Sequence, residues 1–185
     1  MVRTVVVNAL NLFGNEVLSG KIAARRDFAR ACEAVAGGKA GTTVEIDFSG
    51  VKYVSGSWIN WMIVPFVGFA ADDLNDYYLV ISNFPEDSLD DLHLIANAEH
   101  VPFLVRQGEG EIVIIGDLDP GQLATLKAVK KEKEATGAML ADATVKATAW
   151  NNRLRDLNLK RLLRRRKAGR EQFYSLTEPE VQIHG

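Results

Sequence analysis

Cysteine is almost absent from this chain of 185 residues, which contains only Cys32. A single cysteine excludes an intramolecular disulfide and any metal site built from several thiolates. The three histidines also lack the spacing of a metal-binding motif. The composition therefore predicts a protein that folds without disulfides and holds no metal.

Long apolar runs are missing as well. None approaches the roughly 20 residues that a membrane-spanning helix needs. The N-terminus, MVRTVVVNALNLFGNE, has no charged lead followed by a cleavable apolar core. No glycine-rich phosphate loop, nucleophile elbow or paired histidine–carboxylate motif is present. We therefore expect a cytoplasmic protein with no membrane partner, no cofactor and no enzymatic activity.

Charge, by contrast, is abundant and unevenly distributed behind a formal net charge of −2. Residues 1–119 hold 8 basic and 17 acidic side chains, a net charge of −9, whereas residues 120–185 hold 14 and 7, a net charge of +7. Opposite charge in the two parts predicts two modules with different partners. We place the domains at 1–116 and 117–177. A flexible tail is predicted at 178–185, which contains Pro179 and few apolar residues.

The acidic part alternates between strand-like and helix-like patterns. Apolar residues alternate with polar ones in TVEIDFS, whereas the segment from Ser57 onward is apolar nearly all round, as in a buried helix that Pro65 kinks or ends. The order β-α-β-α-β-α-β-β predicts an α/β (α+β) fold, a mixed sheet with flanking helices. Strands are expected at 2–8, 43–49, 77–82, 102–107 and 111–116.

The basic part begins with a helix-start signal, Asp119-Pro120-Gly121-Gln122, in which Asp119 and Gln122 can form a capping box. A short helix at 138–143 and a longer third helix follow, and then a two-stranded ribbon on either side of Ala168-Gly169. This order of elements is that of a small winged helix-turn-helix domain.

The segments NNRLRDL and LLRRRKAGREQFYSL make residues 119–177 resemble the winged helix-turn-helix domains of bacterial transcription regulators. The resemblance implies binding of double-stranded DNA. That family usually has a glycine just before the first wing strand, where this chain has Arg161. We therefore expect Asn158 to supply the left-handed residue.

The segments FGNEVLSGKIAARRDFARA and VEIDFSGVKYVSGSW make residues 1–100 similar to the STAS-like family, related to anti-sigma-factor antagonists. The resemblance implies a module for protein interaction, sensing or dimerisation. In the antagonist branch a partner kinase phosphorylates a residue at the position of Ser57. Ser55 and Trp58 replace that branch's usual acidic residue and glycine, and a serine at the position of Ser57 is more often simply a helix cap.

Positive charge concentrates between Lys146 and Arg170, where ten Lys or Arg accompany one acid, Asp156. In the third helix the spacing turns Ala147, Trp150, Leu154 and Leu157 towards a core, which leaves the opposite face for base edges in the major groove. On the ribbon, basic residues are suited to phosphates or the minor groove. The predicted DNA-binding residues are Lys146, Thr148, Asn151, Asn152 and Arg155 on the helix, and Arg164, Arg165, Arg166, Lys167 and Arg170 on the ribbon.

Two alternatives remain open at this point. The basic ribbon could dock against the acidic first domain instead of DNA. The whole chain could equally be a signalling adaptor, in which the STAS-like domain binds a kinase-like ATPase and the winged helix serves protein contacts. A homodimer is compatible with either function.

Overall fold

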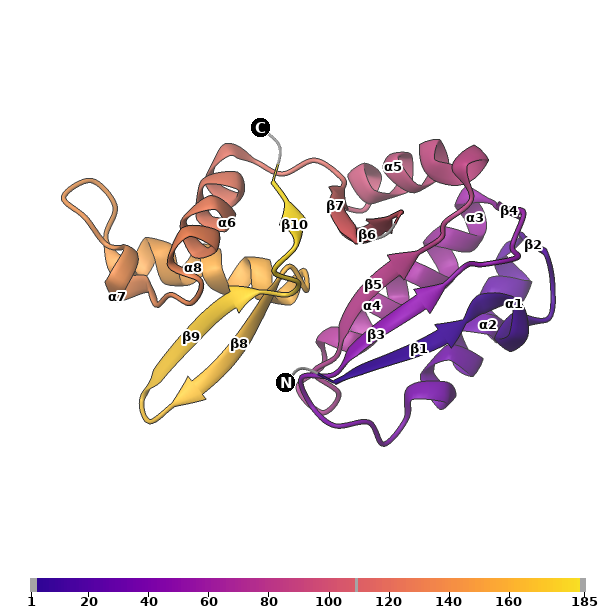
Figure 1. Cartoon of the computed structure of the whole chain (residues 1–185), viewed down its shortest axis with the longest axis horizontal. Helices are drawn as coiled ribbons and strands as arrows, with labels where there is room; N and C mark the ends of the chain where they lie inside the picture. Colours follow the sequence, from indigo (N-terminus) through magenta and orange to yellow (C-terminus); the bar gives the residue numbers. More distant parts are fainter. Residues whose placement is uncertain (1–2, 109, 184–185) are drawn as a thin grey trace.

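A six-stranded sheet organises the part of the chain that the structure, a computed structural model, describes, which is residues 3–108 and 110–183 (Figure 1). Its strands, in spatial order, are β1 (Thr4–Asn8), β3 (Thr43–Asp47), β5 (Tyr78–Ser82), β6 (Phe103–Gln107), β7 (Glu111–Ile115) and β10 (Val181–Gln182). The first four are parallel, β7 is antiparallel to β6, and β10 is parallel to β7. The expected mixed α/β class is confirmed; Val2, assigned to the first strand, lies outside the described residues.

Helices α2 (Lys21–Val35), α4 (Val64–Ala71) and α5 (Leu89–Ala98) contribute to the apolar core on one face of this sheet. Several short elements that the sequence patterns did not reveal lie between the longer ones. They are α1 (Ala9–Phe13), the 3-10 helix η2 (Glu86–Ser88), and a two-stranded ribbon of β2 (Val17–Leu18) and β4 (Tyr53–Val54).

The apolar segment after Ser55 forms a helix that continues through Pro65. It comprises α3 (Gly56–Trp58), a π-helical turn η1 (Ile59–Ile63) and α4. Trp58 is fully buried, and its indole N–H donates to Asp27 at 3.0 Å, which satisfies both buried polar groups. The π turn ends at Ile63, two residues before Pro65. Proline has no backbone N–H, so the helical hydrogen-bond pattern lacks one donor at this point.

The C-terminal module lies against the second face of the sheet at β5, β6 and β7, whereas β1 remains exposed on that face (Figure 1). This module consists of α6 (Pro120–Glu132), α7 (Gly137–Leu140), α8 (Ala147–Leu159) and a hairpin of β8 (Leu163–Ala168) and β9 (Glu171–Leu176). The capping box of Asp119 and Gln122 is present, as predicted. Along β5, Leu79 and Ile81 join the core beneath the helices, whereas Val80 joins the core shared with the C-terminal module.

The segment after the hairpin returns to the sheet. Val181 is 1% exposed and belongs to the second core, and its carbonyl accepts a hydrogen bond from the Lys130 Nζ at 2.7 Å. The prediction of a flexible tail at 178–185 is therefore wrong for β10, since a free edge of β7 offered backbone hydrogen bonds to even a short segment. Residues 184–185 lie outside the described part.

The left-handed residue before the hairpin is Arg161, with φ of 61°, and not Asn158 as expected. Asn158 is helical and buried, where its amide donates to the Leu163 carbonyl at 2.8 Å. A left-handed arginine is strained relative to glycine. Here the Arg161 guanidinium offsets that strain because it pairs with Asp76 at 2.8 Å across the two modules.

Replacement of Val181 by alanine should lower the free energy of unfolding of the whole chain by about 2–3 kcal/mol, because a buried valine in the shared core is lost. The matched control is Val6→Ala in β1, where valine is 61% exposed and the expected loss is about 0.5 kcal/mol. Urea unfolding followed by tryptophan fluorescence measures both. Equal losses in the two variants would contradict the packing of β10 against the module.

Candidate nucleic-acid interface

The helix α8 presents one polar face to solvent, as its sequence spacing predicted. Trp150, Leu154 and Leu157 are buried in the module. The opposite face carries exposed residues, namely Thr148, Asn151, Asn152 and Arg155, with Lys146 exposed at the N-cap. These five are the residues that we predicted for base and phosphate contacts on this helix.

The start of α7 packs very closely against α8. A Cβ atom on Gly137 would lie 2.1 Å from the Asn151 side-chain oxygen and 2.7 Å from the Ala147 carbonyl oxygen. Only glycine allows so close an approach of the two helices at this point. This contact fixes the N-terminal turns of α8 relative to the rest of the module.

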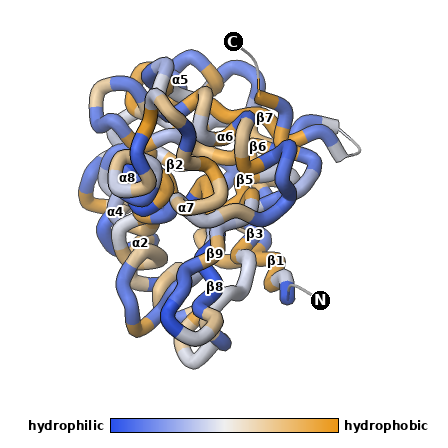
Figure 2. The backbone as a smooth tube through the Cα atoms, turned by 90° about the vertical axis from the view of Figure 1, so that its left-hand side faces the viewer, coloured by the Kyte–Doolittle hydropathy of each residue, from blue (hydrophilic) through white to orange (hydrophobic). Residues whose placement is uncertain are grey.

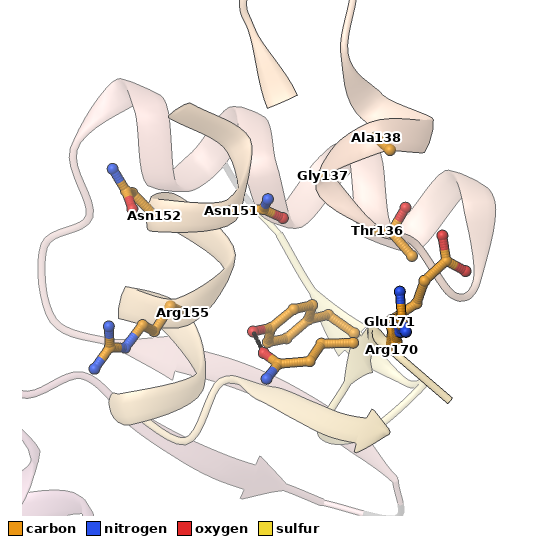
Figure 3. Close-up of a pocket in the computed structure, with 10 residues that line it drawn as sticks. Thr136, Gly137, Ala138, Asn151, Asn152, Arg155, Arg170 and Glu171 are labelled. Carbon is orange, nitrogen blue, oxygen red and sulfur yellow. Dashed lines mark hydrogen bonds between the residues drawn. The ribbon is translucent and has the colours of Figure 1, made fainter. Parts of the chain in front are cut away.

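A polar cleft of about 430 Å³ lies between α8 and the hairpin (Figure 3). Asn152 and Arg155 extend outward from α8 in Figure 3, whereas Asn151 points towards the start of α7. The other walls include Arg170, which the sequence analysis predicted as a DNA contact. The rest were not assigned to a site, namely Thr136, Gly137 and Ala138 before and in α7, and Glu171, Gln172 and Tyr174 on the hairpin.

The hairpin has two faces with different surroundings. Lys167 lies opposite Gln172 in the β8–β9 register, and opposed residues of an antiparallel pair share a face. Lys167 therefore lies on the same face as Gln172, which lines the cleft beside α8. Arg166 lies on the other face, opposite Phe173, and stacks on that ring at 4.9 Å. The strand alternation that separates these two cations could have been read from the sequence.

Ion pairs divide the basic stretch of residues 146–170 into two groups. Five of its ten cations have a carboxylate partner among the residues that the structure describes. The pairs are Lys160–Asp156 at 3.3 Å, Arg161–Asp76 at 2.8 Å, Arg164–Glu178 at 3.6 Å, Arg165–Asp73 at 3.3 Å and Arg166–Glu134 at 2.8 Å. Two of the acids, Asp73 and Asp76, belong to the sheet module, so part of the basic stretch does dock against the acidic domain.

Arg164 is the most deeply engaged of the predicted hairpin residues. Its guanidinium donates to the backbone carbonyls of Thr177 at 2.9 Å and Gly41 at 2.7 Å, and to the Thr43 hydroxyl at 2.5 Å. Burial lowers the pKa of Arg164, and the nearby Glu178 carboxylate opposes that effect. Arg164 therefore stabilises the contact between the modules and is not on the outer surface of the hairpin.

Tyr78 on β5 is the centre of that contact between the modules. Its ring lies beneath the guanidinium groups of Arg161, at 5.0 Å, and Arg164, at 4.3 Å. Its hydroxyl accepts hydrogen bonds from the Arg165 backbone N–H at 3.2 Å and from the Asn158 amide at 3.4 Å. The strand pattern predicted Tyr78 to lie in the sheet but gave no sign of this role.

Four of the five remaining cations form the open part of the surface, and the fifth, Arg153, is half-buried and stacks on Trp150 at 5.4 Å. Within the described residues, Lys146, Arg155, Lys167 and Arg170 are exposed and have no ion-pair partner. Arg155 and Arg170 line the cleft between α8 and the hairpin, and Lys167 lies on the hairpin face that Gln172 shares with this cleft. The hairpin extends away from the helices at the lower end of Figure 2. We name the four exposed cations, with Asn151 and Asn152, the α8–hairpin surface. It is a positively charged surface with amide donors and acceptors.

Ser57, the predicted phosphorylation site, is exposed in the first turn of α3. The cap of this helix is Ser55, whose hydroxyl accepts from the Trp58 N–H at 3.3 Å. The Asp91 carboxylate accepts from the Gly56 N–H at 2.8 Å. A negative charge therefore already lies at this helix start, where it would repel a phosphate on Ser57.

In residues 3–108 and 110–183, no group of three or more histidine, cysteine or acidic side chains is arranged to hold a metal ion. No helix in the same residues is long and apolar enough to cross a membrane. Comparison of the chain with models of protein families, with curated proteins and with solved structures finds no match.

Asp76→Asn should lower the free energy of unfolding by about 2–3 kcal/mol, because it leaves the Arg161 guanidinium, whose side chain is 5% exposed, without its counter-charge. Asparagine tolerates the left-handed backbone of Asp76, which has φ of 47°, so the change is mainly one of charge. The control is Asp73→Asn at the exposed pair with Arg165, with an expected loss of about 0.5 kcal/mol. Thermal and urea unfolding compare them, and similar losses would contradict a buried role for Arg161.

Proposed function

We propose that this chain is a DNA-binding transcriptional regulator in which the α8–hairpin surface contacts duplex DNA. The observation that carries the proposal is the division of the basic stretch. Cations next to the sheet are neutralised by carboxylates, whereas Lys146, Arg155, Lys167 and Arg170 have none among the described residues. Exposed cations grouped on one surface favour binding to phosphates.

The geometry of α8 supports a role in reading bases. Asn152 and Arg155 extend from it to solvent, and Asn151, also exposed, points into the cleft beside the start of α7; asparagine and arginine are suited to adenine and guanine edges in the major groove. The fixed contact between Gly137 and α8 holds this helix at a defined position. The order α6, α7, α8, hairpin, with Ala135 bridged to Tyr174, agrees with the winged helix-turn-helix resemblance.

We propose a STAS-like role for the sheet module in protein interaction, sensing or dimerisation, with no chemistry of its own. Its order of parallel strands, with helices α2, α4 and α5 contributing to one core, is compatible with that resemblance. The signalling-adaptor alternative depends on Ser57, and the Asp91 carboxylate at the same helix start disfavours a phosphate there. The regulator is therefore the function that we put forward for a cytoplasmic protein.

Binding to the DNA upstream of the protein's own gene should be salt-sensitive and sequence-preferring. Fluorescence polarisation at two or more salt concentrations, with an unrelated duplex alongside, measures both properties. Arg155→Ala and Asn151→Ala should weaken binding to the preferred duplex about tenfold or more, as expected for the loss of a base contact. Unchanged affinity and preference in both variants would exclude α8 as the recognition helix.

Neighbouring hairpin residues supply the matched control for the phosphate contacts. Lys167→Ala should reduce the slope of log K against log salt by about 0.9, the value for one phosphate contact. Arg166→Ala should change the slope less, because Arg166 lies on the other hairpin face and donates two hydrogen bonds to Glu134. Failure of the wild-type chain to bind any duplex would overturn the proposed function itself.

A further inference from the structure

A second cavity, of about 490 Å³, lies at the junction of the two modules. It lies between the C-terminal end of α6, the end of β9 and the segment that leads to β10. Its volume is within the range of about 300–1,000 Å³ typical of small-molecule sites. The residues that line it are Lys130, Lys133, Arg164, Ser175, Leu176, Thr177 and Pro179.

The walls of this cavity combine apolar and cationic groups. Leu176 and Pro179 provide apolar surface, to which the methylene stems of the two lysines add. Arg164 is engaged by backbone carbonyls and Thr43, so it forms a wall and has little capacity left for a ligand. The groups available to a ligand are therefore the two lysines and the Ser175 hydroxyl.

Both lysines line the cavity and have N–H donors left for an anion. Lys130 uses one N–H to bond the Val181 carbonyl at 2.7 Å, which leaves two donors. Lys133 has no ion-pair partner within the described residues. The Ser175 hydroxyl makes no hydrogen bond within the same residues. Lys133 is held at φ of 64°, a conformation that costs a lysine free energy and that marks candidate functional positions.

We propose that this junction cavity binds a small molecule with an apolar body and one acidic group. The acid lies between the ammonium groups of Lys130 and Lys133, and the apolar body packs against Leu176 and Pro179. Both lysines are exposed, so their attraction for the acid is screened by salt and adds to the packing of the apolar body. An uncharged molecule of the same shape would leave the two ammonium groups without an anion and bind less well.

The cavity connects a ligand with the C-terminal module directly and with the sheet indirectly, through Lys130. Ser175 and Leu176 belong to the hairpin, and Lys130 donates to the strand β10, which is part of the sheet. A bound ligand therefore contacts α6 and the hairpin, and it stabilises the packing of these elements by mass action. This site does not depend on the proposed DNA binding, and it is tested without DNA.

The probe pair is 8-anilinonaphthalene-1-sulfonate, an apolar aromatic with one sulfonate, and its uncharged analogue N-phenyl-1-naphthylamine. Titration of the full chain, followed by fluorescence, should give one saturable site for the sulfonate and at least about tenfold weaker binding of the uncharged probe. Lys133→Met should weaken sulfonate binding about tenfold, and Ser175→Trp, which fills the cavity, should abolish it. Lys131→Met, an exposed lysine outside the lining, is the control and should bind as the wild type does.

Circular dichroism melting of each variant shows whether it is folded, which matters most for Lys130→Met because that change also removes the bond to Val181. Lys133 and Ser175 make no such structural contact, so these variants decide the question. Equal binding of the two probes would overturn the acidic part of the proposal. Full sulfonate binding by folded Ser175→Trp would overturn the site.

Discussion

The apolar second face of the central sheet is the constraint on which the rest of the structure depends. Helices α2, α4 and α5 bury only the face that Leu79 and Ile81 occupy, and a sheet with one open apolar face is not stable in water. Val80, Leu104 and Ile112 need a cover on the other face, and the C-terminal module provides it. The two modules therefore share a core, although their net charges have opposite sign.

Burial of that face also buries the arginine side chains at the junction of the two modules. Once the hairpin base lies over β5, Arg161 and Arg164 are removed from water and need partners. Asp76, Glu178 and the face of Tyr78 supply them. The cost of leaving a buried guanidinium unpaired makes these contacts obligatory wherever the modules are packed together.

The same packing separates the basic side chains that pair with carboxylates of this chain from those that are exposed to a binding partner. Lys167 and Arg170 lie far enough along the hairpin to escape the carboxylates of the sheet module, and Arg155 lies on the solvent face of α8. A cluster that is uniform in sequence is thus divided in the described residues into five cations paired with carboxylates and five without such a partner. The short strand β10 pairs with β7 and accepts a hydrogen bond from Lys130, which lines the second cavity.

The sequence by itself determined the local features: the mixed α/β class, the Asp119 cap, the buried helix through Trp58, and the inward face of α8 at Trp150 and Leu154. These follow from periodicity and capping, which act over a few residues. Only the tertiary structure decided which cations remain free, that β10 joins the sheet, and that Arg161 takes the left-handed position. Each depends on a partner far away in the chain, such as Asp76, which is 85 residues from Arg161. Local patterns contain no information on such distant pairs.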